Sequence, residues 1–249
     1  AGICGGDSIL DCAGICGGDS ILDACGVCGG DACGVCGDDS VLDACGVCGG
    51  DNLFNQHTIA AGMIHSLAVQ SDGTVMAWGF GGSGELGNGT NEDSNLPSQV
   101  VGLSNVVAVD AGNSTSFSIQ SDGTLWAWGR GSGGELGNGT NENSNLPSQV
   151  VGLSDVVVVD AGDNHSLALK SDGSVWAWGY NCHGELGNST ITGSNSNVPV
   201  LVSALTYVDV ASGGHHSLAL RSDGTVWAWG YNAFGQLGNG TNSSNNIPS

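Results

Sequence analysis

The chain has 249 residues, of which 24 are acidic and three are basic, so its formal net charge at pH 7 is −21. This charge repels nucleic-acid phosphates and anionic membrane surfaces, so we expect no nucleic-acid partner. No apolar run approaches the roughly 20 residues of a membrane-spanning helix, so we expect no membrane insertion. Glycine is abundant, at 45 residues, yet seven tryptophans and many aliphatic residues predict a folded, turn-rich chain.

Two unrelated repeats divide the chain near residues 52 to 56. Residues 1–52 repeat a unit of about 8 to 12 residues, and residues 53–249 repeat a unit of about 50 residues. Because both termini fall inside a repeat, we expect the chain to be a segment of a longer protein whose export signal lies outside these residues.

Nine of the ten cysteines precede residue 49, which predicts a disulfide framework formed outside the cytoplasm. The sequence does not determine the connectivity. A ladder of short loops joins Cys4 with Cys12, Cys16 with Cys25, Cys28 with Cys33, and Cys36 with Cys45, and leaves Cys48 over. As an alternative, the Cys25–Cys28 and Cys33–Cys36 pairs hold zinc or an iron–sulfur cluster, although the spacing between the pairs is short for a zinc ribbon.

The same segment is rich in aspartate and contains neither Lys nor Arg, so its carboxylates need a counterion. Calcium takes six to eight oxygen ligands, which carboxylates and the carbonyls of glycine-rich turns supply. The alternative is that the aspartates are simply solvated. The candidate calcium ligands are Asp7, Asp11, Asp19, Asp23, Asp31, Asp38, Asp39, Asp43 and Asp51. These Cys-Gly-Gly-Asp repeats resemble those of large bacterial surface proteins and are distantly similar to the type 3 repeats of thrombospondins, which implies calcium binding.

The long repeat predicts β-structure. Segments such as TSFSIQ and TLWAWG are short, rich in β-branched or aromatic residues, and bounded by turn residues. Between two of them an SDG tripeptide recurs, at Ser71, Ser121, Ser171 and Ser222, and its Asp-Gly pair readily takes the positive φ angles of a hairpin tip. About four short strands per unit, without a helical period, indicate an all-β fold of β-propeller blades. We expect blades at about 57–109, 110–160, 161–210 and 211–249.

The strings AGDNHSLALKSDGSVWAWGYNCHGELGN and SGGHHSLALRSDGTVWAWGYNAFGQLGNGT resemble the repeat of the regulator of chromosome condensation family, whose members form seven-bladed propellers. The second copy departs from this pattern, with Thr115 where other copies have His65, His165 and His216. Only about three and a half blades are present, so two blade faces and their strand edges lack a neighbour. Either further blades of a longer chain or self-association covers them, and head-to-tail self-association generates filaments.

Several residues invite a functional interpretation that we consider secondary. The recurring histidines are expected to make structural hydrogen bonds between blades, and the tryptophans are expected to pack between blades rather than stack on sugars. The Asn-x-Thr sequences at Asn88, Asn138, Asn188 and Asn239 fit turns better than glycosylation acceptors. Cys182 is expected to be a lone thiol, and we find no catalytic constellation.

Together these features predict a non-catalytic extracellular protein, secreted or at the cell surface, with a structural or adhesive role. In this hypothesis calcium and disulfides stiffen residues 1–52 as a stalk for the blades. The alternative is a secreted propeller that captures a protein or glycan ligand. A nucleotide-exchange factor, another activity that the resemblance allows, fits poorly with the acidic, cysteine-rich chain.

Overall fold

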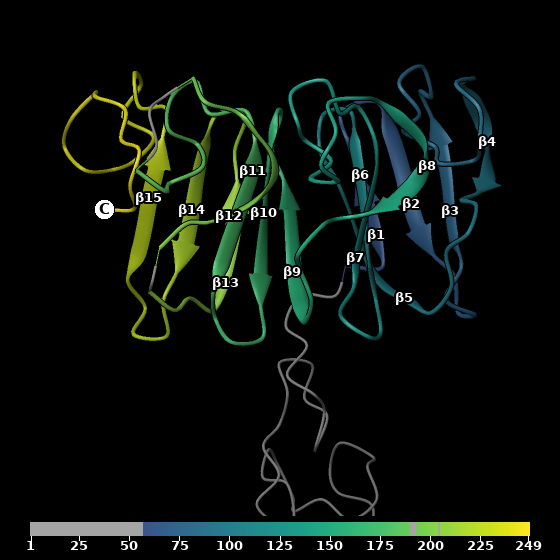
Figure 1. The fold of residues 1–249 in the computed structure, drawn as a ribbon, viewed down its shortest axis with the longest axis horizontal. Helices are drawn as coiled ribbons and strands as arrows, with labels where there is room; N and C mark the ends of the chain where they lie inside the picture. Colours follow the sequence, from purple (N-terminus) through teal and green to yellow (C-terminus); the bar gives the residue numbers. More distant parts are fainter. Residues whose placement is uncertain (1–56, 190–192, 204) are drawn as a thin grey trace, which may run out of the picture. The chain divides into compact units, whose positions relative to one another are not determined.

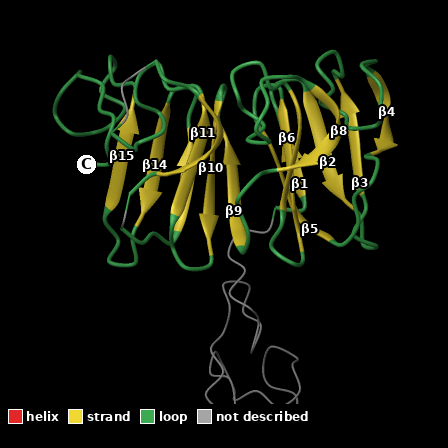
Figure 2. Cartoon of the chain, viewed as in Figure 1, coloured by secondary structure: helices red, strands yellow, loops and turns green. Residues whose placement is uncertain are grey.

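The computed structural model describes residues 57–189, 193–203 and 205–249. These residues form strands, turns and loops, as Figure 2 shows. No helix long and apolar enough to span a membrane occurs among them. The expected all-β class is therefore confirmed for this part of the chain, while the predicted irregular calcium and disulfide region lies outside the described residues.

Fifteen strands form four antiparallel sheets, which we call blades 1 to 4 (Figure 1). Blade 1 contains β1 (Ile59–Ala61), β2 (His65–Val69), β3 (Val75–Gly79) and β4 (Ser94–Gln99). Blade 2 contains β5 (Val106–Ala111), β6 (Thr115–Gln120), β7 (Leu125–Gly129) and β8 (Ser144–Gln149). Blade 3 contains β9 (Val156–Ala161), β10 (His165–Lys170), β11 (Val175–Gly179) and β12 (Ser196–Leu201). Blade 4 contains β13 (Asp209–Ser212), β14 (His216–Leu220) and β15 (Val226–Gly230).

Blade 4 has three strands where the others have four, as the sequence predicted. A start of the fourth strand is present, because Asn245 bridges to Gly230 and the Ser249 amide donates to the Ala228 carbonyl. In every blade the strands follow one another in sequence order across the sheet, and the first strands β1, β5, β9 and β13 contact their counterparts in the neighbouring blades.

Each SDG tripeptide forms the tip of the hairpin between the second and third strands, as predicted. Only the glycine takes a positive φ, for example +78° at Gly73, so the expectation that the aspartate shares this conformation was wrong. The aspartate stabilises the turn with its side chain instead. Asp72 Oδ1 accepts hydrogen bonds from the Thr74 amide and hydroxyl, which is the usual way in which Asp closes a turn.

The hydrophobic core lies between blades, not within them. Three clusters of buried side chains each combine residues from two successive blades. In the first cluster, Leu67 and Leu86 of blade 1 pack with Trp128 of blade 2. A single blade therefore cannot bury its own apolar faces, which is why propellers need several stacked blades.

The sheets begin a few residues before the repeat boundaries expected from the sequence. The cuts after residues 109, 160 and 210 fall inside β5, β9 and β13, the first strands of blades 2 to 4. In blades 1 to 3 the alanine of an Ala-Gly pair is the last residue of the first strand, at Ala61, Ala111 and Ala161. The boundary predicted near residues 52 to 56 lies outside the described residues.

Candidate functional site

The calcium and disulfide ligands predicted from the sequence lie outside the described residues. This applies to Asp7, Asp11, Asp19, Asp23, Asp31, Asp38, Asp39, Asp43 and Asp51, and to Cys4, Cys12, Cys16, Cys25, Cys28, Cys33, Cys36 and Cys45. Bound calcium and disulfides therefore stay predictions. Within the described ranges no three His, Cys, Asp or Glu side chains are grouped to hold a metal ion, and Cys182 is an exposed free thiol.

Two of the recurring histidines connect adjacent blades, as predicted. His65 Nε2 of blade 1 lies 2.9 Å from Ser116 Oγ of blade 2, and His165 of blade 3 makes the same contact with Ser217 of blade 4. Because the Ser116 hydroxyl donates to the Glu85 carbonyl, the proton between His65 and Ser116 belongs to the histidine. Burial lowers the pKa of His65 to about 4, so this histidine is neutral at pH 7 and acts as a structural donor.

A backbone carbonyl is the centre of each blade interface. The Glu85 carbonyl accepts from the Trp128 indole at 2.8 Å as well as from Ser116. The Glu135 and Glu185 carbonyls accept the indole N–H groups of Trp178 and Trp229 in the same way. Since these three indole rings are fully buried, the prediction that tryptophans pack between blades is confirmed for them.

Aspartates in the first strands also join neighbouring blades, a role that the sequence analysis did not identify. Asp110 Oδ2 accepts from the Ala161 amide at 2.7 Å, and Asp160 Oδ1 accepts from the Ser212 amide at 2.6 Å. Burial, together with the nearby charge of Asp160, raises the pKa of the Asp110 carboxyl to about 7. The only sequence signal for this role was the recurrence of Asp before Ala-Gly in two copies.

The buried glutamate side chains have different neighbours at the three interfaces. Arg130 Nε lies 3.7 Å from Glu135 Oε1, and His215 Nδ1 lies 3.7 Å from Glu185 Oε1. Glu85 is equally buried, and its Oε1 has no hydrogen-bond partner among the described residues. The other oxygen of Glu85 accepts from the Ser83 amide, which closes a turn within the loop after β3. These carboxylates thus serve loop structure.

The turns between the first and second strands surround a hollow to which all four blades contribute. The hollow has a volume of about 320 Å³ and is lined by all four turns, at residues 61–63, 111–113, 161–163 and 212–214. Most of its lining residues are glycine or alanine, and the polar ones are Asn113, Asp163 and Ser212. The turn of blade 1 differs from the others because it carries Met63 and Ile64.

Three apolar side chains are exposed beside this hollow on blade 1. Met63 is 72% exposed, Ile64 48% and Phe80 37%. The Phe80 amide donates to the Ile64 carbonyl, so the two segments that carry these side chains are adjacent. The corresponding residues of blade 2 are Asn113, Ser114 and Arg130. We call Met63, Ile64 and Phe80 the blade 1 apolar patch.

The Asn-x-Thr sequences form turns at three of their four positions. The Asn88, Asn138 and Asn239 side chains each accept from the amide and the hydroxyl of the threonine two residues later. The prediction that these asparagines stabilise turns is confirmed at these positions.

Among curated proteins, a short similarity to a ubiquitin ligase is found. The E3 ubiquitin-protein ligase HERC2 of human and of mouse is 38% identical over 52 residues, which is 21% of this chain and 1% of HERC2. This similarity covers about one repeat, so the chain spans a very small part of these curated relatives.

Solved structures match over a much longer stretch. Human WBSCR16 is 26% identical with a TM-score of 0.67, over 77% of this chain and 51% of that one. Prp20p of Saccharomyces cerevisiae, which was studied for its binding properties to Gsp1p and histones, is 24% identical with a TM-score of 0.69, over 77% of this chain and 49% of Prp20p. The chain therefore spans about half the length of these proteins.

The RCC1-like domain model matches residues 24–249, which is most of the chain. The antiparallel blades and the interfaces between them agree with this match. The chain thus belongs to the RCC1-like domain family.

Proposed function

We propose that the chain is an extracellular structural or adhesive protein whose blades bind other proteins, with residues 1–52 stiffened by calcium and disulfides. The observation that carries the binding role is the blade 1 apolar patch. Contiguous exposed apolar side chains mark protein interaction sites when they are surrounded by polar surface. A protein ligand also agrees with the RCC1-like relatives, of which Prp20p is described as binding proteins.

The extracellular part of the proposal depends on the cysteines and the charge. Nine cysteines within 48 residues are typical of chains that mature in an oxidising compartment. An acidic chain that lacks basic residues over its first 52 positions is also suited to calcium-rich surroundings. Prp20p, at 24% identity, supports the fold alone, so its own ligands are not carried over to this chain.

A non-catalytic role is part of this proposal. The titratable side chains between the blades already have structural partners. His65 and His165 bond to serines of the next blade, and Asp110 and Asp160 accept backbone amides. Groups that are buried and engaged in this way hold blades together and do not face a substrate.

Glycan capture has less support than protein binding. The tryptophans that would stack on sugars are buried or partly buried. The Trp126 and Trp176 indoles donate to the hydroxyls of Thr124 and Ser174, each just before the same strand. An exposed aromatic ring outside the blade interfaces is Phe234, which is 86% exposed.

The proposal is tested in two parts, location and adhesion. Intact producing cells should carry the chain on their surface, where added protease digests it. The eight cysteines of the proposed ladder should resist alkylation until a reductant is added, whereas the exposed Cys182 should react without one. Beads coated with the chain should adhere to these cells, and Met63→Ser with Ile64→Ser and Phe80→Ser should lower adhesion at least roughly tenfold, as expected for truncation of interface anchors. A Leu96→Ser control, at an exposed residue of β4, should adhere normally. A protease-protected chain with reduced thiols contradicts the proposal.

A further inference from the structure

The two ends of the blade stack expose positions that the inner interfaces bury. Val226 of blade 4 is 62% exposed, whereas its counterparts in the earlier blades, Val75, Leu125 and Val175, are 0% exposed. Ile59 of blade 1 is 73% exposed. Its counterparts Val109, Val159 and Val210 are 1%, 7% and 6% exposed. Both ends are therefore unfinished copies of the interface that already joins the blades.

We define the two end surfaces by the residues that match the inner interfaces. The N-face, on blade 1, consists of Ile59, Ser66 and Trp78. The C-face, on blade 4, consists of His216, Val226, Gln236, Leu237 and Gly238.

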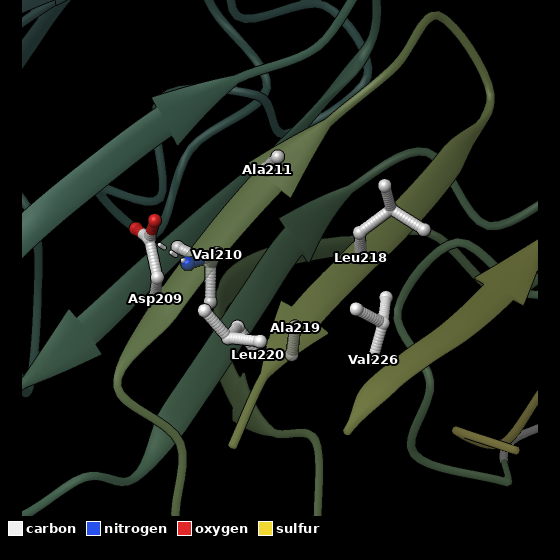
Figure 3. Close-up of a pocket in the computed structure, with 7 residues that line it drawn as sticks. All are labelled: Asp209, Val210, Ala211, Leu218, Ala219, Leu220 and Val226. Atoms are coloured by element: carbon white, nitrogen blue, oxygen red, sulfur yellow. Dashed lines mark hydrogen bonds between the residues drawn. The ribbon is translucent and has the colours of Figure 1, made fainter. Parts of the chain in front are cut away.

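Each face is hollowed where a neighbouring blade would pack. The hollow of the C-face has a volume of about 180 Å³, and Figure 3 shows Leu218 and Val226 on adjacent strands at its wall. The hollow of the N-face has a volume of about 380 Å³ and includes Ile59 and Trp78. Asp209 is the one acidic side chain among the residues that line the two hollows, so both are mainly apolar.

The hydrogen-bonding groups of the two faces are complementary. Inside the stack, a tryptophan indole and a serine hydroxyl of one blade donate to a carbonyl of the preceding blade, at 2.7 to 3.2 Å. The N-face presents the same two donors, on Trp78 and Ser66. The C-face presents the Gln236 carbonyl at the position of Glu85, and His216 at the position of His65. Within the described residues, the side chains of Trp78, Ser66 and His216 make no hydrogen bond.

A glycine shows that the C-face has an open place for an indole ring. At the inner interfaces, a Cβ added to Gly87, Gly137 or Gly187 would lie 2.6 to 2.8 Å from the indole nitrogen of the next blade's tryptophan. Gly238 is the fourth member of this series, and a Cβ added there would meet nothing within 4 Å. The backbone at Gly238 therefore leaves space for an indole ring like those that lie against Gly87, Gly137 and Gly187.

We propose that a second copy of this chain covers the C-face with its N-face, so that copies associate head to tail. The proposal rests on the structural role and the protein binding proposed above, and it names the partner. A second copy fits because the contact continues the interface that the stack repeats three times, with the same donors, the same acceptors and the same apolar positions. Such a contact is heterologous, so it closes into a ring or extends into a filament, depending on the angle between copies.

Two arginine variants test this pairing without disturbing the fold, since both positions are exposed. Ile59→Arg blocks the N-face and Val226→Arg blocks the C-face. The full chain should associate in sedimentation equilibrium between about 1 µM and about 100 µM, because interfaces of ordinary size bind at micromolar concentrations or more tightly. Each variant alone should be monomeric, with association weakened at least roughly 100-fold by the buried charge. Leu96→Arg, on the exposed outer strand β4, should associate like the unmodified chain.

The decisive sample is a mixture of the two variants. Ile59→Arg retains a C-face and Val226→Arg retains an N-face, so the mixture should form a one-to-one dimer and nothing larger. A monomeric unmodified chain, unaltered association of either variant, or a mixture that stays monomeric overturns the proposal. An N-face covered by residues 1–55 of its own chain would give the first of these results. A surface-located chain that stays monomeric contradicts this inference alone, whereas an intracellular chain that pairs in this way contradicts the proposed function alone.

Discussion

The contribution of one blade interface to stability can be measured by comparing two tryptophans at the same repeat position. Trp178 is fully buried between blades 2 and 3, donates to the Glu135 carbonyl at 2.7 Å and contacts the Phe117 ring edge-on at a centroid distance of 6.0 Å. Trp78 has the same place in blade 1 but lies on the N-face, where none of the described blades covers it. Trp178→Ala leaves a cavity and an acceptor with fewer donors, which should lower the free energy of unfolding by about 3–5 kcal/mol.

Trp78→Ala should cost roughly 1 kcal/mol or less, because partly exposed side chains contribute little when truncated. For a unit of this size the loss at Trp178 lowers the melting temperature by roughly 10 °C. Urea and thermal unfolding followed by far-UV circular dichroism measure both variants, at a protein concentration low enough to keep the chain monomeric. Equal destabilisation by the two substitutions would refute the view that stability resides between blades.

Four further predictions concern the glycine contacts, two buried titratable groups and the N-terminal region. Gly137→Ala and Gly238→Ala carry the same backbone strain, at φ of +63° and +65°, but only Gly137 faces an indole, so urea unfolding should show the larger loss, by at least about 1 kcal/mol, for Gly137→Ala. Because the pKa of Asp110 is raised to about 7, its contribution to stability is lost as pH rises from about 4 to 7, and Asp110→Asn should flatten that part of the pH profile. The pKa of His165 is lowered to about 3 by burial and by the charges of neighbouring histidines. Its contribution is therefore lost as pH falls below 6.5, and His165→Gln should flatten the acidic part. A chelator should increase the hydrodynamic size of the chain if calcium orders residues 1–52, and an unchanged size would contradict that hypothesis.

The pH predictions require difference profiles between variants. Between pH 4 and 6.5 the aspartate and the histidine change stability in opposite directions. The fold favours the protonated form of Asp110 and the deprotonated form of His165. The unmodified chain therefore shows a partly cancelled slope, and only the subtraction of a variant profile isolates each group.

The fold of the described residues could be predicted from local sequence, because each blade repeats the same pattern of strand and turn residues. Alternating aliphatic residues define the strands, and Asp-Gly turns define the hairpin tips. The strand register was harder to predict from the sequence. The Ala-Gly pair looks like the start of a repeat unit, but its alanine is the last residue of the first strand. In blade 2 this follows from the pairing of β5 with β6, in which Ala111 lies opposite Ser116. Position along a strand depends on pairing across the sheet, which the linear pattern does not contain.

The interface contacts were only partly predictable for a similar reason. A recurring histidine is visible in the sequence, and its structural role was expected. The acceptor at each interface is a backbone carbonyl. Every residue has a carbonyl, so the residue types in the sequence do not show which one accepts. Asp110 reaches an amide of the next blade, which no spacing within one repeat predicts. The blade 1 apolar patch is formed by a turn and by the loop after β3, which approach each other only in the folded sheet.

The use of a backbone acceptor explains why the repeats tolerate substitution at their interfaces. Thr115 replaces the histidine in blade 2, and no bond joins it to Ser166 within the described residues, yet Ser166 and Trp178 still donate to the Glu135 carbonyl. Gln236 replaces the glutamate in blade 4 without altering the carbonyl that an incoming indole requires. Because the acceptor is a main-chain carbonyl, the interface is retained when side chains at these positions differ. Blade 4 therefore keeps the acceptor, the glycine and the apolar residues that contact with a further blade requires. The C-face is in this sense chemically equivalent to the interfaces inside the stack, which is why we expect it to be covered.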